Sequence, residues 1–268
     1  YVNTVSPSYA GKILKDGELT NGLNEVLKKK KNFKGILNGI DDYGWNPEKD
    51  KLIQTKLDSD FEAYKYDNKV SLLNKIGLEF HPKTAVLGMI TRLDEQKGIP
   101  LLLEAADKIL KENVQLVVLG KGDSKYRNKF QRLQKKYPEK LKIKFGIDNQ
   151  LAHMIQAGAD IFLIPSLSEP CGLNLMYSLI YGTVPVIRLT GGMKDVAEPY
   201  DPDSGDGNTI TFENYDAKEL VKSVKSALKL FEDEEKWMAL INNGRFEDFS
   251  WDESSKEYEE IYKTLNKS

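Results

Sequence analysis

Short apolar runs alternate with amphipathic stretches through the middle of the chain. The apolar runs predict strands at Ala85–Ile90, Val114–Leu119, Ile143–Ile147, Ile161–Pro165, Val184–Leu189 and, more weakly, Thr209–Phe212. Most of these runs are continuously apolar and rich in β-branched residues, which is typical of strands buried on both faces. The pattern therefore predicts the interior of a parallel sheet.

Amphipathic helices are predicted between these strands. Their helical periods cover Ile99–Leu110, Lys125–Tyr137, Gln150–Ala157, Leu173–Tyr181 and Ala217–Phe231. Alternation of strand and helix at this spacing indicates right-handed βαβ units. We therefore predict an α/β fold over residues 36–250, built on a doubly wound, Rossmann-like parallel sheet.

The two ends of the chain do not follow this repeat. A lone short strand with no partner nearby is predicted at Tyr1–Val5. Ser6 is expected to cap a helix that continues through Tyr9–Leu14. Trp251–Leu265 predicts an amphipathic helix after Ser250. Because these pieces are hard to seat on the central sheet, we expect both ends to pack in part against a neighbouring domain.

Composition narrows the possible partners. The chain has 268 residues, and 39 Lys and Arg against 41 Asp and Glu give a formal net charge of −2. No nucleic acid and no membrane is expected as a partner, because the chain lacks a general basic field and a long apolar run. The basic run Lys28–Lys31 is interpreted as solvated surface, with a polyanion contact as the alternative. The single Cys171 excludes an internal disulfide and favours a reducing compartment.

Ligands of open parallel sheets bind at the carboxyl ends of the strands, so the loops there are the candidate site. Arg92 and Lys97 follow the first predicted strand. A forked donor beside a point cation suits a diphosphate. An equal alternative is that both bases pair with Asp94 and Glu95 at the surface.

A second candidate loop, Ser168–Leu173, follows the fourth predicted strand. Pro170 suits the first turn of the next helix, where free backbone N–H groups bind anions or hydroxyls. Glu169 can accept hydrogen bonds from sugar hydroxyls, or it merely offsets the helix dipole. The glycine loops Gly120–Asp123 and Thr190–Gly192 are interpreted as structural turns or as ligand contacts.

Other catalytic constellations are not found in the sequence. His81 and His153 have no partner at metal-ligand spacing and are expected to be structural. No Ser/His/Asp set and no G-x-S-x-G motif occurs. We expect no metal site.

The motifs T-R-L-x-x-Q-K-G (91–98), E-P-C-G-L (169–173), Y-G-T-x-P-x-x-R-x-T-G-G (181–192) and F-S-W (249–251) closely resemble the starch/glycogen synthase family of GT-B glycosyltransferases. T-V-S-P-S-Y-A (4–10) and N-G-I-D (38–41) look like its inter-domain region. Many retaining GT-B enzymes carry E-x7-E, but Tyr177 replaces the second acid here. In this respect the chain resembles starch/glycogen synthases of the ADP-glucose type, which also tend to lack the second acid.

The resemblance implies that this chain is the C-terminal, nucleotide-sugar-binding half of a longer enzyme, because the family's K-x-G-G-L motif is absent from it. On that basis residues 1–35 end the first domain and link it to the second. Residues 36–250 form the Rossmann-like domain, and residues 251–268 form a helix that crosses back to the first domain.

The resemblance also implies a reaction: glucose passes from ADP-glucose to the non-reducing end of an α-1,4-glucan, with retention and without a metal or other cofactor. Arg92, Lys97 and Glu169 would be catalytic. The donor would contact Cys171, Gly172, Leu173, Asn174, Tyr177, Gly146, Ile147, Thr190, Gly191 and Gly192. The glucan would bind through the missing domain, so this chain alone would be inactive. A bacterial cytoplasm and a plastid stroma are both compatible locations. Alternatives are a UDP- or GDP-sugar transferase and a non-catalytic nucleotide-sugar-binding module.

Overall fold

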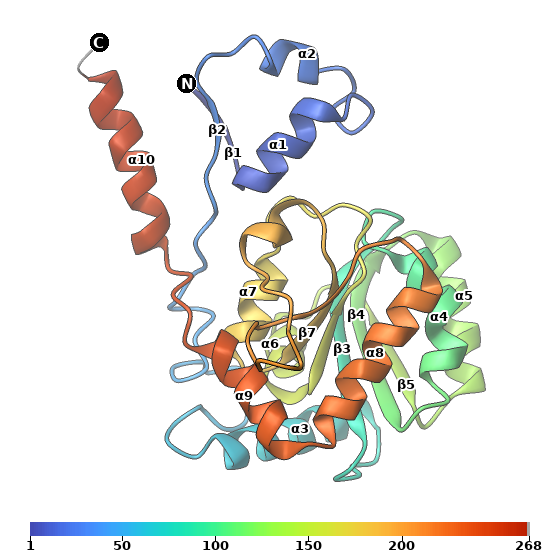
Figure 1. Ribbon diagram of the computed structural model, residues 1–268. Helices are drawn as coiled ribbons and strands as arrows, with labels where there is room; N and C mark the ends of the chain where they lie inside the picture. Colours follow the sequence, from blue (N-terminus) through green and yellow to red (C-terminus); the bar gives the residue numbers. More distant parts are fainter. Residues whose placement is uncertain (267–268) are drawn as a thin grey trace.

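The computed structural model describes residues 1–266 and contains a central sheet of six parallel strands (Figure 1). The strand order is β5-β4-β3-β6-β7-β8. The strands are β3 (Ala85–Leu93), β4 (Val114–Gly122), β5 (Leu141–Phe145), β6 (Ile161–Ile164), β7 (Val184–Arg188) and β8 (Ile210–Phe212). All six agree with predicted runs, although β3 and β4 extend further than the apolar pattern indicated.

Helices cover both faces of the sheet, which confirms the doubly wound α/β prediction. One face packs against α4 (Ile99–Ile109), α5 (Ser124–Lys136), α8 (Ala217–Phe231) and α9 (Glu234–Arg245). The other packs against α3 (Phe61–Ile76), α6 (Asn149–Gly158) and α7 (Leu173–Ile180). Side chains alternate across β3, with Leu87 in the first layer and Val86 in the second, so the strand is buried on both sides.

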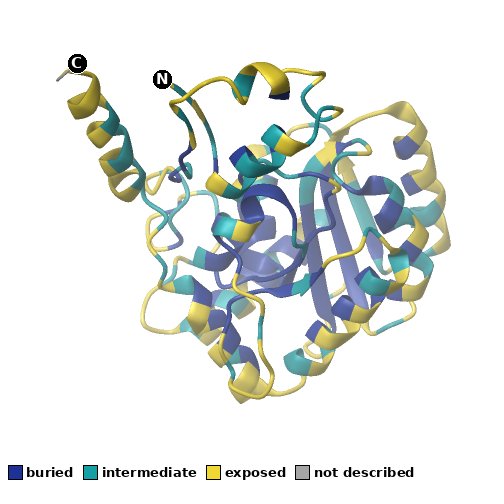
Figure 2. Cartoon of the chain, turned by 45° about the horizontal axis from the view of Figure 1, so that its top comes forward, coloured by how far each residue is buried: buried dark blue, intermediate teal, exposed yellow. Residues whose placement is uncertain are grey.

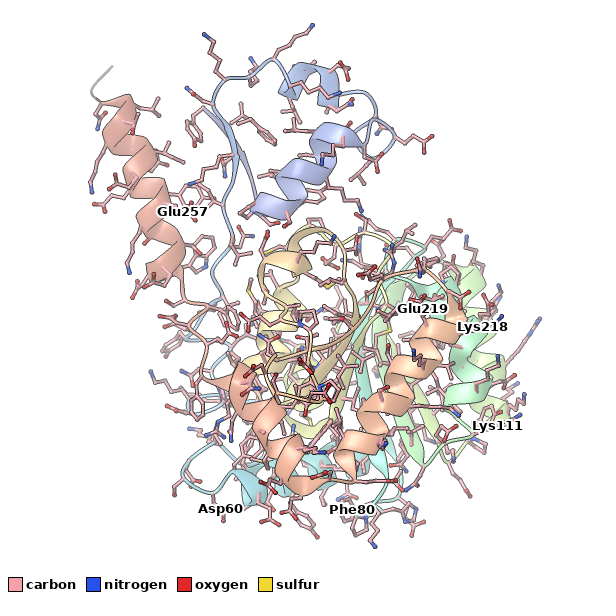
Figure 3. All side chains as sticks on the ribbon, in the orientation of Figure 1. Asp60, Phe80, Lys111, Lys218, Glu219 and Glu257 are labelled. Carbon is pink, nitrogen blue, oxygen red and sulfur yellow. The ribbon has the colours of Figure 1, made fainter. Side chains whose placement is uncertain are left out.

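Two of the helices that cover the sheet, α3 and α9, were not predicted. Helix α3 is capped by Asp60, whose side chain accepts from Ala63 N at 2.9 Å, and Figure 3 labels Asp60 at the base of the molecule. Its buried face includes the polar residues Asn68 and Lys69. An apolar stripe was therefore too weak to detect, because polar contacts replace part of the hydrophobic packing in this helix.

The order in which successive strands are added to the sheet reverses at β3. The chain runs outward through β4 and β5, and then crosses back to β6, which lies on the other side of β3. Such a topological switch point leaves a crevice beyond the carboxyl ends of the two strands. The site is therefore expected beyond β3 and β6.

Residues 1–35 form a small separate unit, the N-terminal lobe. Strand β1 (Val2–Thr4) pairs in parallel with β2 (Phe33–Gly35), so the prediction that the first strand lacks a partner was wrong. The two strands are joined through α1 (Pro7–Lys15) and α2 (Asn24–Leu27). Ser6 caps α1 as predicted, accepting from Tyr9 N at 3.0 Å.

Helix α10 (Trp251–Leu265) stands away from the sheet, beside the N-terminal lobe. None of its residues is buried, and Figure 2 shows it in the colours of exposed and intermediate residues. Asn3 Nδ2 donates to Tyr258 Oη at 3.0 Å, and Lys34 forms an ion pair with Glu257, which is labelled in Figure 3. The predicted segment 251–268 extends beyond this helix to residues 267 and 268, which lie outside the described residues. Between residues 1 and 266, no helix combines the length and apolarity needed to cross a membrane.

Candidate functional site

A cavity of about 960 Å³ lies at the switch point. It is lined by the carboxyl ends of β3, β4 and β6 and by the starts of α6 and α7. The predicted residues that line it are Arg92, Lys97, Gly146, Ile147, Glu169, Cys171, Gly172, Leu173 and Asn174. A second cavity of about 660 Å³, between β8 and α8, contains none of the predicted residues.

Lys97 and Glu169 form an ion pair inside this cavity. Lys97 Nζ lies 2.6 Å from Glu169 Oε2, and the two side chains are 20% and 13% exposed. Ser166 Oγ also donates to Glu169 Oε2 at 3.3 Å. The carboxylate is therefore held in place before any ligand binds, and Lys97 remains able to donate to a second anion.

Arg92 pairs with Asp94, one of the two acids in the surface alternative, while its contact with a diphosphate stays a prediction. Its guanidinium contacts Asp94 at 3.4 Å and donates to Gln96 at 3.2 Å, and it also lines the cavity. Lys121 lies directly opposite Arg92 in the β3–β4 register and lines the same cavity. The cavity therefore has more positive charge than the sequence motifs alone indicated.

The glycines of the loop after β4 serve close packing. A Cβ on Gly120 would lie 2.4 Å from Thr91 O, and one on Gly122 would lie 2.4 Å from Leu93 O. Both positions therefore require glycine for the approach of β3 and β4. Both also line the cavity, and a contact between this loop and a ligand stays a prediction.

The predicted donor contacts at Thr190, Gly191 and Gly192 do not lie in the cavity lining. Gly192 N donates to Glu169 O at 2.9 Å, and a Cβ on Gly191 would lie 2.0 Å from the same carbonyl oxygen. Gly191 also has φ +59, which favours glycine. This turn therefore packs against the backbone of the Glu169 loop, which agrees with the interpretation of Thr190–Gly192 as a structural turn.

Tyr177, which was predicted to contact the donor, is likewise not among the residues that line the cavity. Its ring stacks on Trp45 at 4.2 Å, and Trp45 stacks in turn on His153 at 3.7 Å. Asp50 Oδ2 lies 2.7 Å from His153 Nδ1 and accepts from Tyr181 Oη at 2.7 Å. The side chain of Tyr177 is therefore part of a partly buried aromatic stack that the sequence analysis did not detect.

The charge of Asp50 is stabilised by these contacts. Burial alone would raise its pKa, but the hydrogen bonds from His153 and Tyr181 outweigh burial and lower the pKa. His153 is thus a structural histidine, as expected.

The start of α7 presents backbone donors to the cavity. Gly172 caps the helix with φ +91, a conformation that favours glycine. Burial raises the pKa of Cys171, so this thiol is a packed side chain and not an activated nucleophile. Asn174 Nδ2 donates to Ile90 O at 3.0 Å, which ties α7 to β3.

The loop after β5 forms an open edge of the cavity, where Ile147 is followed by the polar residues Asp148 and Asn149. Gly146 has φ +123, and Ile147 is 87% exposed. No group of three or more His, Cys, Asp or Glu residues that could hold a metal ion occurs in the part of the chain from residue 1 to residue 266.

Comparison with known proteins identifies the family. A sequence model described as "Glycosyl transferases group 1" matches residues 74–246, which is more than half of the chain. The chain belongs to the group 1 glycosyl transferases. The resemblance expected from the sequence motifs is thereby confirmed.

Relatives within this family are named glycogen synthases. The chain is 43% identical over 264 residues to that of Thermotoga petrophila, which covers 98% of this chain and 54% of the relative. It is 41% identical over 266 residues to that of Alkaliphilus metalliredigens, covering 99% and 56%. The chain thus spans about half the length of the curated relatives it matches.

Solved structures agree with this placement. The catalytic domain of Arabidopsis thaliana starch synthase IV, bound to ADP and acarbose, matches with a TM-score of 0.91 and 34% identity, over 98% of this chain and 55% of that one. Sucrose-phosphate synthase from Thermosynechococcus elongatus matches with a TM-score of 0.67 and 20% identity, over 98% of this chain and 58% of that one. At that lower identity only the fold is comparable.

Proposed function

We propose that the chain is the donor-binding part of a retaining glucosyltransferase that moves glucose from ADP-glucose to the non-reducing end of an α-1,4-glucan. The observation that carries the proposal is the Lys97–Glu169 pair, which lies beside Arg92 in a cavity at the switch point of the sheet. The names of the glycogen synthase relatives, and the ADP bound to the starch synthase structure, support the choice of donor.

The positive side chains would act on the departing diphosphate. As the bond from the glucosyl carbon to the diphosphate oxygen breaks, negative charge grows on ADP and positive charge on the sugar ring. Arg92 and Lys97 would stabilise that negative charge, and removal of one such donor typically costs about 10²- to 10³-fold in turnover. No group needs to move far, because both side chains already line the cavity.

The remaining residues would hold the rest of the donor. Glu169 would accept hydrogen bonds from glucosyl hydroxyls, while the free N–H groups of the E-P-C-G-L corner, at residues 171–173, would bind sugar oxygens. Asn174 would lie toward the phosphates or the ribose. The adenine would lie against Gly146 and Ile147, at the open end of the cavity.

The acceptor would bind between this chain and a second domain. We assign residues 1–35 to the end of that domain and its linker, residues 36–250 to the donor domain, and residues 251–268 to a helix that crosses back. The exposed α10 and the two-stranded β1–β2 sheet support this assignment, since both offer surfaces for further packing. On this basis the isolated chain binds the donor and does not elongate glucan, because half of the cleft is missing.

Nucleotide binding tests the proposal. Calorimetric titration of the chain with ADP, UDP and GDP is expected to give the strongest binding with ADP. A clear preference for UDP or GDP would indicate a transferase of another donor class. Glucan elongation by residues 1–268 alone would contradict the assignment to an incomplete cleft.

Metal independence is part of the same proposal, because two positive side chains are available to neutralise the diphosphate. ADP binding, and transfer by the enzyme with both domains, should be unchanged when EDTA replaces added Mg²⁺. A loss of activity that Mg²⁺ restores would contradict it. A reducing location, in a bacterial cytoplasm or a plastid stroma, suits the single buried thiol of Cys171.

A further inference from the structure

Helix α1 of the N-terminal lobe is fastened to the donor domain at two points. At its first turn, Asp195 Oδ2 accepts from Ser6 Oγ at 2.6 Å and from Ser8 N at 2.9 Å. One turn later, Lys12 Nζ donates to Ser168 Oγ at 3.2 Å and to Thr190 Oγ1 at 3.4 Å. A helix outside the region matched by the family model thus contacts the loop that carries Glu169.

Lys12 is a partly buried cation whose ammonium group donates to hydroxyl oxygens. Within residues 1–266, no carboxylate oxygen lies within 4.0 Å of its ammonium group. Burial and the nearby positive charge of Arg188 lower the pKa of Lys12. Desolvation of the ammonium is unfavourable, so its contacts with the two hydroxyls offset part of that cost, and the negative charge of Asp16 acts in the same direction.

Tyr9 lies on the same face of α1, one turn before Lys12. Burial and the negative charge of Glu169 raise the pKa of the Tyr9 phenol. This face of α1 is therefore directed toward the Glu169 loop as a whole, and not only toward Ser168.

The backbone of the loop is braced from within the donor domain. Leu167 N donates to Gln96 O at 2.8 Å, Leu167 O accepts from Arg188 Nη1 at 3.0 Å, and Glu169 O accepts from Gly192 N at 2.9 Å. The hydrogen bond from Lys12 is of a different kind. It holds the side chain of Ser168, next to the carboxylate residue, and comes from the N-terminal lobe.

We propose that Lys12 is a positioning residue for Glu169, so that the N-terminal lobe takes part in recognition of the glucosyl group of the donor. This inference rests on the proposed function. Binding groups must hold their geometry to within about 0.5 Å to be effective. Lys12 keeps Ser168, and with it Glu169, in the position that accepts the sugar hydroxyls.

The proposal predicts different effects on the affinities for ADP and for ADP-glucose. ADP lacks the glucosyl group and depends on Arg92 and Lys97, whereas ADP-glucose also depends on Glu169. Lys12→Met is therefore expected to weaken binding of ADP-glucose by about tenfold, the effect of one charge-assisted hydrogen bond, while ADP changes by less than about twofold. Lys12→Arg should retain most of the affinity, since its guanidinium can donate to the same hydroxyls.

Calorimetric titration of the chain with both ligands measures this ratio. Lys15→Met is the matched control, because Lys15 is an exposed lysine in the same last turn of α1. It should leave both affinities unchanged. An equal loss of ADP and ADP-glucose affinity in Lys12→Met, or no loss, overturns the role of Lys12. Failure of the unmodified chain to bind ADP-glucose overturns this role and the proposed function together.

Ser168→Ala provides a second test from the domain side if Lys12→Met does not fold. It removes the same hydrogen bond and should reproduce the selective loss of ADP-glucose affinity. Where both variants fold, the double variant should show little further loss, because the two side chains form one interaction. Unchanged ADP-glucose affinity in Ser168→Ala overturns the proposal.

Discussion

The Lys97–Glu169 pair makes a prediction in which its two members act in opposite directions. Glu169→Gln removes a negative charge beside the site of the diphosphate and leaves Lys97 without its partner. ADP should then bind more tightly, although glucose transfer by the enzyme with both domains is lost. Lys97→Met removes the cation and leaves the Glu169 carboxylate facing the diphosphate, so ADP should bind more weakly.

The structure sets the size of both effects. Lys97 Nζ lies 2.6 Å from the Glu169 carboxylate, so a phosphate oxygen bonded to its other side lies about 5 Å from that carboxylate. Two unit charges at that separation repel by about 0.8 kcal/mol in water and about 3 kcal/mol at a protein surface of lower dielectric. For this partly exposed pair we expect about 1–2 kcal/mol, or roughly fivefold to thirtyfold tighter ADP binding. Loss of the charge-assisted bond in Lys97→Met should cost about 1.5–3 kcal/mol.

Calorimetric titration with ADP at low salt measures both affinities, and thermal unfolding reports whether each variant remains folded. The tightening in Glu169→Gln should shrink as salt is added, because the repulsion is electrostatic. If both variants weaken ADP binding by a similar factor, or neither changes it, the pair is not beside the diphosphate and the assignment of this cavity is wrong.

Three further predictions concern stability and packing. Gly191→Ala should lower the free energy of unfolding in urea by about 2–4 kcal/mol, because its Cβ would lie 2.0 Å from Glu169 O. The control Gly205→Ala, at a position with open space and φ +80, should cost only about 1 kcal/mol. Equal costs in the two variants would contradict the close approach at Gly191. Burial lowers the pKa of Lys65 to about 7, so between about pH 7 and pH 10.5 the unfolded chain binds more protons than the folded chain. The free energy of unfolding should therefore rise over this range, by at most about 1.4 kcal/mol per pH unit. Lys65→Met should remove this slope. Tyr177→Phe should keep the stack on Trp45 and leave the affinity for ADP within about twofold. A large loss of affinity would instead indicate that the Tyr177 hydroxyl contacts the donor.

The apolar runs alone determined the central architecture. Continuous stretches such as Val114–Leu119 must be buried on both faces, and alternation with helices leaves a parallel sheet as the solution. Since all carboxyl ends of parallel strands share one edge, the sequence alone places Arg92, Lys97 and Glu169 near one another. The local chemistry of capping, as at Ser6, was equally readable.

Contacts between segments remote in the sequence were decided only by the tertiary structure. The pairing of β1 with β2, the ion pair between Lys97 and Glu169, and the contact of Lys12 with Ser168 depend on strand order and on how helices seat against each other. Tyr177 lies on a helix that borders the cavity, but the direction of its side chain follows from the position of Trp45, in a segment with no regular pattern. Periodicity records which residues are buried, because hydrophobic burial is non-directional. Which partner a polar or aromatic group meets is a directional matter, and the folded geometry alone settles it.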